Sequence, residues 1–214
     1  MKAIVFTEKN KISYQDITTP SLEKEQVLIA VRASGMCHTD LEILRGNYGS
    51  SAFPLVPGHE YAGTVVQIGD EVTKVKVNDN VVVDPNIECG YCLSCQNNNA
   101  HLCETLGAYG VTVNGGFAQY SVVHQNALHD IEDLPFHIAA LAEPLGCALN
   151  GVGAVNAGAS NNALIFGAGP MGLLFALAAK DKGAKKITFV DISSDRLILA
   201  ESMGFNAMQS NEEN

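Results

Sequence analysis

The sequence predicts a mixed α/β protein in which a β-rich first part precedes the start of a parallel sheet. Short apolar or alternating segments, separated by polar and glycine-containing turns, recur through the first 123 residues and are typical of a partly closed sheet. From residue 163 onward, an apolar segment, a glycine turn and a helical segment occur in order, and a second apolar and a second helical segment follow. Strands and helices in alternation imply a parallel sheet. We therefore expect two domains, residues 1–150 and 151–214.

Composition and charge exclude several classes of protein. The chain has 214 residues, of which 47% are hydrophobic and 17% are charged, as in a globular protein. Its net charge of −10 argues against nucleic acid or an anionic membrane as the main partner, because both attract clustered Lys and Arg. Residues 1–6 are too short for a signal peptide, and no apolar stretch reaches the length of a membrane span. We expect a cytoplasmic protein with reduced cysteines, in which a cysteine cluster indicates a metal or a catalytic site.

Six strands and one short helix are expected in the first part. The strands are predicted at residues 2–6, 11–16, 27–33, 61–69, 80–83 and 116–123. Asn78 suits a left-handed conformation in the turn before the fifth strand. The helix is expected to run to Leu44, with Thr39 or Asp40 as its N-cap and with Arg45 and Gly46 at its end. Residues 84–110 show no regular pattern.

Helices and strands alternate in the second part. A helix rich in Ala and Leu is expected at residues 136–154, with an interruption at Pro144, and small residues at 157–162 form a connector. Strands are then expected at 163–166 and 187–190, and helices at 170–180 and 194–203. A dinucleotide-binding fold has about six strands in two halves, so two strands leave even the first half without its third. We therefore expect an incomplete second domain.

The segment from residue 37 to residue 60 carries three different metal donors. Cys37, His59 and Glu60 offer a thiolate, an imidazole and a carboxylate, which zinc takes in sites that keep a position open for water or substrate. Glycines, serines and prolines fill the stretch between them, and such a loop can bring its two ends to one point. Because cysteine and histidine are also common core residues, the metal interpretation depends on the rest of the chain.

Four further cysteines lie within 15 residues, at Cys89, Cys92, Cys95 and Cys103. Two gaps of two residues and one of seven let four thiolates converge on one tetrahedral ion. Four sulfurs leave no open position, so we expect a structural zinc in the loop 89–103. Unbound thiols and an iron–sulfur cluster are the alternatives. A zinc ribbon for nucleic acid is disfavoured, because no Lys or Arg occurs from residue 84 to residue 120.

A glycine turn between a strand and a helix matches Gly-x-Gly-x-x-Gly, the fingerprint of a dinucleotide site. Asp191 ends the next predicted strand, where a carboxylate accepts hydrogen bonds from the ribose of NAD and repels the extra phosphate of NADP. Arg196 could instead pair with that phosphate, but we give Asp191 more weight and expect NAD. An ordinary glycine turn is the alternative. The turn residues predicted to bind the cofactor are Gly167, Gly169, Pro170, Met171 and Gly172.

An open zinc site, a four-cysteine loop and a dinucleotide fold, in this order, resemble the zinc-dependent medium-chain dehydrogenases over almost the whole chain. The resemblance implies that residues 1–150 form a GroES-like catalytic domain and that residues 151–214 begin a Rossmann domain, with the active site in the cleft between the domains. It also implies a catalytic zinc at Cys37, His59 and Glu60, and a structural zinc at the four clustered cysteines.

Three more residues receive a role from this resemblance. Glu143, followed by Pro and Leu, resembles the carboxylate at or near the metal in the polyol and threonine dehydrogenase branch, and the alternative is an ordinary acid at a helix start. Whether Glu60 or Glu143 binds the zinc directly is open. Thr39 matches the hydroxyl that starts a proton relay. Glu42 stands where the family often has a histidine that passes the proton on, so the relay route is also open.

The predicted function is the oxidation of a secondary alcohol, a polyol or sugar alcohol with or without a phosphate, to a ketone. Zinc and NAD are the expected cofactors, and a small-molecule alcohol is the expected partner. The dimers and tetramers of the family imply a homo-oligomer for a full-length chain. Two other functions are considered: a truncated, inactive zinc-binding remnant, and a zinc-free reductase of the same superfamily, against which the metal donors argue.

Overall fold

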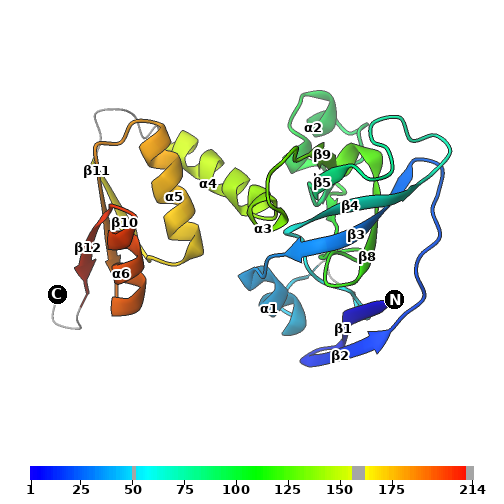
Figure 1. Ribbon diagram of the computed structural model, residues 1–214, viewed down its shortest axis with the longest axis horizontal. Helices are drawn as coiled ribbons and strands as arrows, with labels where there is room; N and C mark the ends of the chain where they lie inside the picture. The colour runs from blue at the N-terminus through cyan, green and yellow to red at the C-terminus, as the bar shows by residue number, and fades with distance from the viewer. Residues whose placement is uncertain (50–51, 156–161, 211–214) are drawn as a thin grey trace. The chain divides into compact units, whose positions relative to one another are not determined.

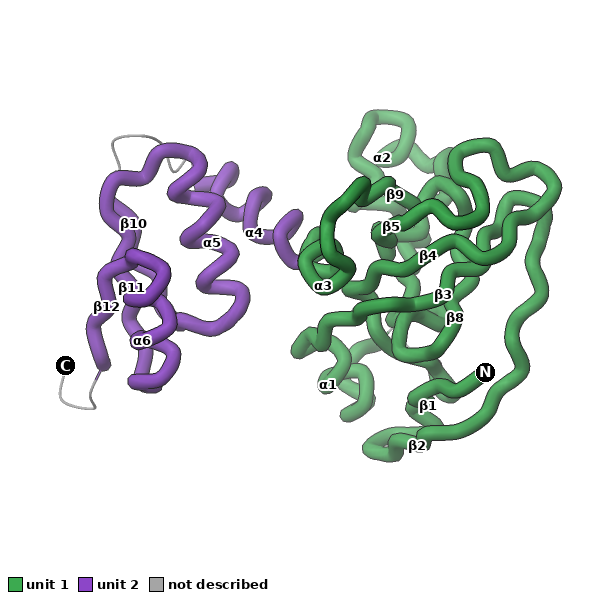
Figure 2. The backbone as a smooth tube through the Cα atoms, in the orientation of Figure 1, with its two compact units in different colours: residues 1–143 green, residues 144–214 purple. Residues whose placement is uncertain are grey.

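The computed structural model describes residues 1–49, 52–155 and 162–210, and the chain divides into two compact units (Figure 2). The first unit comprises residues 1–143 and the second comprises residues 144–214. The expected boundary at residue 150 falls inside helix α4 (Ala142–Ala154), which begins in the first unit and continues into the second. The mixed α/β class is confirmed, because strands dominate the first unit and alternate with helices in the second (Figure 1).

An antiparallel sheet of five strands frames the first unit, in the order β8-β3-β4-β5-β9. Valines, isoleucines and tyrosines on these strands share one core, in which Ile29, Tyr61 and Val65 are fully buried. Residues of these types favour strands because they pack well on a pleated surface. The sheet consists of β3 (Gln26–Ser34), β4 (Tyr61–Ile68), β5 (Asn80–Val83), β8 (Tyr120–His124) and β9 (Leu128–Asp130). The last strand was not predicted, and β8 begins later than expected.

Smaller elements complete the first unit. The strands β1 (Lys2–Glu8) and β2 (Lys11–Asp16) form the predicted hairpin, and Asn10 has a positive φ of 59° in its turn. Asn78 has the predicted left-handed conformation, with φ at 76°. The segment expected to be irregular contains short elements around the clustered cysteines: β6 (Asn86–Ile87), α2 (Leu93–Gln96), η1 (Ala100–Leu102) and β7 (Gly107–Ala108), with β6 paired to β7. A further short helix, η2 (Gln125–Ala127), joins β8 to β9.

Helix α1 (His38–Leu44) begins two residues earlier than Thr39 as the N-cap would allow, and three residues earlier than Asp40 would allow. Cys37 occupies the N-cap position, and the Asp40 carboxylate accepts a hydrogen bond from the Cys37 main-chain N–H at 2.9 Å. Asp40 therefore acts from inside the first turn, as the acid of a capping box does. The helix ends as predicted at Arg45, and Gly46 follows with a positive φ of 67°.

The predicted helix at residues 136–154 is two helices, α3 (Phe136–Ala139) and α4. The interruption was expected at Pro144, but it lies before α4, and Pro144 is the third residue of that helix. Proline lacks an N–H and fits the first helical turn, where the N–H groups have no intrahelical partner. It therefore marks a helix start here. Of the small-residue connector at 157–162, residues 157–161 lie outside the described residues, as do Ser50 and Ser51 of the earlier loop.

The second unit is built on three parallel strands, so the expectation of only two is wrong. Their order is β10 (Asn162–Phe166), β11 (Lys186–Asp191) and β12 (Asn206–Gln209). The third strand was missed because its four residues have no strand-like pattern, and pairing with β11 from Thr188 to Asp191 determines its conformation. Helices α5 (Pro170–Asp181) and α6 (Ser194–Ser202) connect the strands, close to their predicted positions. The buried centre contains Ala176 and Phe189.

Among the described residues, no helix combines the length and the apolar character that crossing a bilayer requires.

Candidate functional site

Cys37, His59 and Glu60 lie together in the first unit, and we call them the mixed-donor group. One sulfur, one ring nitrogen and one carboxylate oxygen from these residues all lie within 4.8 Å of one another. The pairing of β3 with β4 brings them together, because the last residue of β3 pairs with Tyr61. His59 and Glu60 directly precede β4, and Cys37 follows β3 by a short turn. The three donors therefore meet at one end of the central strand pair.

The mixed-donor group is largely buried. His59 is 6% exposed and Glu60 is 7% exposed, whereas Cys37 is half-buried. A sulfur, a nitrogen and an oxygen donor suit zinc in sites where a fourth position is left for water or substrate. The donor set and its spacing therefore fit a zinc ion.

Asp40 connects the parts of this group, although the sequence suggested only a helix cap for it. Its side chain is 3% exposed. One oxygen accepts the hydrogen bond from Cys37 N, and the other accepts one from Gly58 N at 3.3 Å and lies 3.5 Å from His59 Nδ1. A carboxylate behind a metal-binding histidine orients the ring and increases its basicity. The three-residue spacing between Cys37 and Asp40 was the available signal.

The electrostatics of His59 reflect this arrangement. Burial acts to lower the pKa of the imidazole, but the carboxylate of Asp40 and the nearby Cys37 outweigh burial and raise the pKa to about 9. The distance of 3.5 Å from Nδ1 to Asp40 is too long for a good hydrogen bond, and the described residues supply no other partner for this buried atom. His59 and Asp40 therefore attract each other mainly through their opposite charges.

Among the described residues, the donors that meet within 4.8 Å are Cys37, His59 and Glu60, without Glu143. The charge of Glu143 still affects the pKa of Glu60. Burial raises the pKa of the Glu60 carboxyl first, the positive His59 lowers it, and the carboxylates of Glu143 and Asp40 raise it further. Glu143 lies in the first turn of α4. The structure therefore brings Glu60 to the other donors and leaves Glu143 beside them.

The two residues of the expected proton relay have different surroundings. The Thr39 hydroxyl lies 3.5 Å from the Cys37 sulfur. Glu42 instead accepts hydrogen bonds from Asn47 and Arg45, both at 2.8 Å, and its carboxylate lies 3.3 Å from His38 Nε2. The Asn47 amide, followed by Arg45, lowers the pKa of Glu42. Thr39 is thus close to the donors, whereas Glu42 stays ionised within a set of polar side chains.

The four clustered cysteines also converge, and we call them the four-cysteine group. Their sulfurs all lie within 4.8 Å of one another, with Cys92 Sγ 3.5 Å from Cys95 Sγ. Main-chain N–H groups point at the sulfurs: Cys89 N donates to Cys103 Sγ, and Cys92 N donates to Cys89 Sγ, both at 3.3 Å. The N–H groups of Cys89 and Thr105 lower the pKa of Cys103 to about 6. The pKa of Cys92 is also lowered, whereas burial, followed by the neighbouring Cys92, raises the pKa of Cys95 to about 12. The surroundings therefore favour the thiolate, the form that binds zinc, at Cys92 and Cys103.

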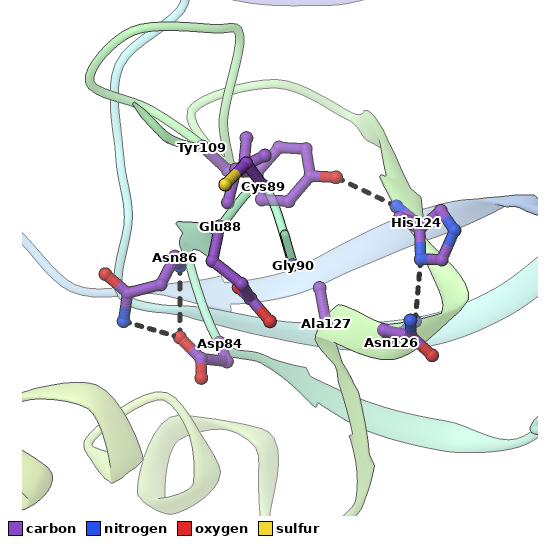
Figure 3. A pocket seen from close by; sticks show the side chains of 10 residues that line it. Asp84, Asn86, Glu88, Cys89, Gly90, Tyr109, His124, Asn126 and Ala127 are labelled. Atoms are coloured by element: carbon purple, nitrogen blue, oxygen red, sulfur yellow. Dashed lines mark hydrogen bonds between the residues drawn. The ribbon is translucent and has the colours of Figure 1, made fainter. Parts of the chain in front are cut away.

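A polar cavity of about 380 Å³ lies beside the four-cysteine group (Figure 3). In its wall, the Tyr109 hydroxyl accepts a hydrogen bond from His124 N at 2.9 Å, and His124 Nδ1 accepts one from Asn126 N at 3.1 Å. Asp84 accepts two hydrogen bonds from Asn86, at 3.0 and 2.8 Å. Because these groups bond to one another, we interpret the cavity as part of the support of the cysteine loop.

The glycine turn of the second unit has the shape that its fingerprint requires. Gly167 has a positive φ of 97°, which glycine adopts without steric cost. A Cβ atom on Gly172 would overlap the carbonyl oxygen of Gly167, so the third glycine lets α5 start against the turn. A Cβ on Gly169 would have Arg196 Nη1, at 3.9 Å, as its nearest neighbour. Pro170 begins the helix, and a Cβ on Gly167 would meet no atom of the described residues within 4 Å.

Asp191 ends β11 as predicted, and it is tied to the glycine turn. One carboxylate oxygen accepts a hydrogen bond from Ala168 N at 2.7 Å, and the other accepts one from Ser193 N at 2.8 Å. These main-chain donors, Ser193 first, lower the pKa of the carboxyl, and Arg196 contributes from 3.9 Å. Each oxygen has a second lone pair, so the carboxylate can keep these two hydrogen bonds and also accept one from a ribose hydroxyl. Met171, the second residue of α5, is exposed.

The first unit matches a protein-family model, that of the alcohol dehydrogenase GroES-like domain. The match covers residues 23–133, which is just over half of the chain. It includes all the residues of the mixed-donor and four-cysteine groups.

Individual proteins are similar to the whole chain. A D-altritol 5-dehydrogenase of Agrobacterium fabrum is 47% identical over 100% of this chain and 65% of its own length. A D-arabinitol dehydrogenase of Uromyces fabae is 36% identical over 87% of this chain and 53% of its own length. A solved structure from Sinorhizobium meliloti, described as a zinc-binding dehydrogenase bound to NADP, has a TM-score of 0.93 and 32% identity, covering 99% of this chain and 62% of its own. The chain thus spans less than two thirds of the length of each of these proteins.

Proposed function

Because the chain belongs to the zinc-dependent medium-chain dehydrogenases, in the polyol and threonine dehydrogenase branch, we propose that it takes part in the oxidation of a secondary alcohol to a ketone. The observation that carries this proposal is the meeting of Cys37, His59 and Glu60 within 4.8 Å. The substrate class is a polyol or sugar alcohol, with or without a phosphate. D-Altritol and D-arabinitol are the first candidates, because similar proteins are named for them.

Both donor groups fit zinc, and they fit different kinds of zinc site. The mixed-donor group would hold a zinc ion with a position left open, and the four sulfurs would enclose a structural one. When bound at the first site, zinc supplies Lewis acidity that lowers the pKa of an alcohol. Asp40 lies against Nδ1 of His59, so Nε2 is the nitrogen left for the metal. Glu143 stays a candidate for an alternative carboxylate ligand.

Thr39 is the chain's candidate for moving the substrate proton. Its hydroxyl lies 3.5 Å from the Cys37 sulfur and can accept a proton while it donates its own onward. Glu42 is a poor next acceptor near neutral pH, because its partners keep it ionised with a lowered pKa. We propose that Glu42 orders the turn after α1 through Arg45 and Asn47. The onward proton route would then pass through water.

The second unit would bind the cofactor. Bound NAD supplies the nicotinamide that accepts the hydride. The glycine turn would receive the pyrophosphate, with Gly167, Gly169 and Gly172 providing the clearance described above. Asp191 would accept a hydrogen bond from the adenosine ribose, and its lowered pKa keeps it able to do so. Arg196 would face the phosphate side of the turn.

The proposal also includes the location, the assembly and the partners of the enzyme. A cytoplasmic location suits it, because the clustered thiols must stay reduced to bind zinc. A homo-oligomer, as in related dehydrogenases, is the proposed assembly of the full-length enzyme. Neither nucleic acid nor a membrane is proposed as a partner, because the chain carries a net charge of −10.

The test combines zinc content with turnover. Protein purified without chelators should contain two zinc ions per chain by native mass spectrometry, and it should form NADH when polyols and NAD are supplied. His59→Ala should lower both the zinc content and the rate, whereas His137→Ala, at an exposed histidine, should change neither. Two bound zinc ions without NADH formation on any polyol would favour the inactive zinc-binding protein. Full activity of His59→Ala would overturn the proposal.

A further inference from the structure

The turn between β3 and α1 contains a glycine, Gly35, that lies directly opposite Glu60. Ser34 pairs with Tyr61 at the end of the antiparallel ladder, and Gly35 N donates a hydrogen bond to the Glu60 carbonyl oxygen at 2.7 Å. Residues opposite each other in such a ladder direct their Cβ atoms to the same side, about 4.5–5.5 Å apart. A side chain at position 35 would therefore share its space with the side chain of Glu60.

The available space is smaller than a methyl group needs. A Cβ atom built on Gly35 lies 3.1 Å from the Cβ of Glu60 and 3.3 Å from its Cδ, and it overlaps the Oε2 oxygen. Carbon atoms that pack well are about 3.5–4.0 Å apart. The Glu60 carboxylate thus lies over the main chain of Gly35, where any other residue would place its side chain.

Backbone conformation gives no separate reason for a glycine here. Gly35 is absent from the glycines with positive φ, whereas Gly46 and Gly58 have φ values of 67° and 91°. An alanine could adopt the backbone conformation of Gly35, so the restriction at this position is one of space alone.

We propose that Gly35 is a positioning residue of the metal centre, because its missing side chain lets the Glu60 carboxylate lie with Cys37 and His59. The inference rests on the part of the proposed function that assigns zinc to the mixed-donor group. A methyl group at position 35 displaces the far end of Glu60, which is flexible, and shifts the strand ends by only a few tenths of an ångström. The chain therefore still folds, but the oxygen donor leaves the group.

The experiment is a double-mutant cycle of Gly35→Ala and Glu60→Ala, read by metal binding in the absence of substrate. Zinc affinity is measured by competition with a chromophoric chelator, and the visible spectrum of the cobalt-substituted protein reports the donors. Gly35→Ala should weaken zinc binding at the mixed-donor group by about 10- to 100-fold, as lost support of a metal ligand usually does. The other zinc should stay bound at the four cysteines.

The cycle separates this role from a general defect. In the Glu60→Ala background, Gly35→Ala should cause little further loss, because the carboxylate it displaces is already gone. Gly49→Ala is the matched control, since a Cβ at Gly49 meets no atom of the described residues within 4 Å. Unchanged zinc affinity of Gly35→Ala, or losses that add in the double variant, would overturn the proposal. If Gly35→Ala does not fold, a folded double variant supports the proposal and an unfolded one overturns it.

These readouts are independent of turnover. A protein that binds two zinc ions but oxidises no alcohol would contradict the proposed function and leave the role of Gly35 intact. If the protein oxidises polyols and Gly35→Ala keeps a normal zinc affinity, the proposed function stands and the role of Gly35 is overturned.

Discussion

The mixed-donor group and the four-cysteine group both bring their donor atoms within 4.8 Å, but the chain assembles them differently. The four cysteines come from one 15-residue loop with little regular structure. The mixed donors come from two segments, one at each end of the connection between β3 and β4. The first group therefore depends on local spacing, and the second depends on the pairing of two strands.

The two groups also differ in what surrounds the donors. Main-chain N–H groups of the same loop point at the cysteine sulfurs, so the loop supplies its own support. The mixed-donor group depends on Asp40, which contacts it from inside α1, and on the open space at Gly35. We infer that the four-cysteine group stabilises the fold, whereas the mixed-donor group is held in place by the fold and is available for chemistry.

Replacing Cys37, the cysteine of the mixed-donor group, should have the largest effect of the changes considered. It should lower activity more than stability. Cys37→Ser should lower kcat/KM for polyol oxidation by about 1,000-fold, or about 4 kcal/mol. The melting temperature should change by only a few degrees, because most of the surrounding core is retained. Steady-state kinetics and calorimetry check both parts, and Cys147→Ser, outside both groups, is the control. A large loss of stability with retained activity would mean that the mixed-donor group supports the fold and not the chemistry.

The corresponding change in the four-cysteine group should affect stability first. Cys95→Ser removes one of four zinc ligands, and losing an ion held at about 100 times its Kd costs roughly 3 kcal/mol. For a chain of this size that lowers Tm by about 5–12 °C. Turnover measured well below Tm should stay within about threefold of the wild type. If activity and stability fall together, the two groups are coupled rather than independent.

Asp40→Asn should give a smaller effect, confined to the mixed-donor group. An amide keeps the shape of the carboxylate but loses the charge behind His59, and such losses weaken metal binding by about 10- to 100-fold. Zinc titration of the variant should show one weakened site and one unchanged site. Asp79→Asn, which alters a carboxylate in a turn of the same unit, is the matched control. Equal weakening of both zinc sites would show that Asp40 acts on the whole unit.

The contact between Asp40 and His59 should also be visible in the pH dependence of the metal-free protein's stability. The folded pKa of His59, about 9, is above its ordinary value of 6.5. The folded state therefore holds a proton that the unfolded state has lost between these pH values, so this stabilisation is complete below pH 6.5 and decreases as pH rises through 9. Asp40→Asn should remove most of it. The difference in Tm between wild type and variant, measured from pH 6 to pH 9.5, should decrease with rising pH. A constant difference would mean that Asp40 and His59 do not interact in this way.

Much of the fold could be predicted because its signals are local. The helices α5 and α6 follow from apolar periodicity and from the glycine turn, and the strands of the central sheet follow from β-branched residues. Four strands were missed, β6, β7, β9 and β12. Each is only two to four residues long, so no pattern distinguishes it from a loop. Hydrogen bonds to β5 and β11 make β9 and β12 strands, and β6 and β7 pair with each other.

The metal donors could be predicted from their types and spacing, but their support could not. Asp40 was considered only as a helix cap, and no role was predicted for Gly35. Asp40 contacts Gly58, which is 18 positions away, and Gly35 faces Glu60 across the sheet. Contacts over such separations depend on strand register, which the residue types of the loop alone do not determine.

The sequence by itself determined which donors are present, where strands and helices alternate, and that four cysteines can enclose one ion, because these properties depend on neighbours along the chain. Only the tertiary structure decided that Glu60 meets Cys37 and His59, that Asp40 contacts Gly58, and that Gly35 lies opposite Glu60. These properties depend on distances between residues far apart in the sequence, and those distances exist only after β3 and β4 have paired.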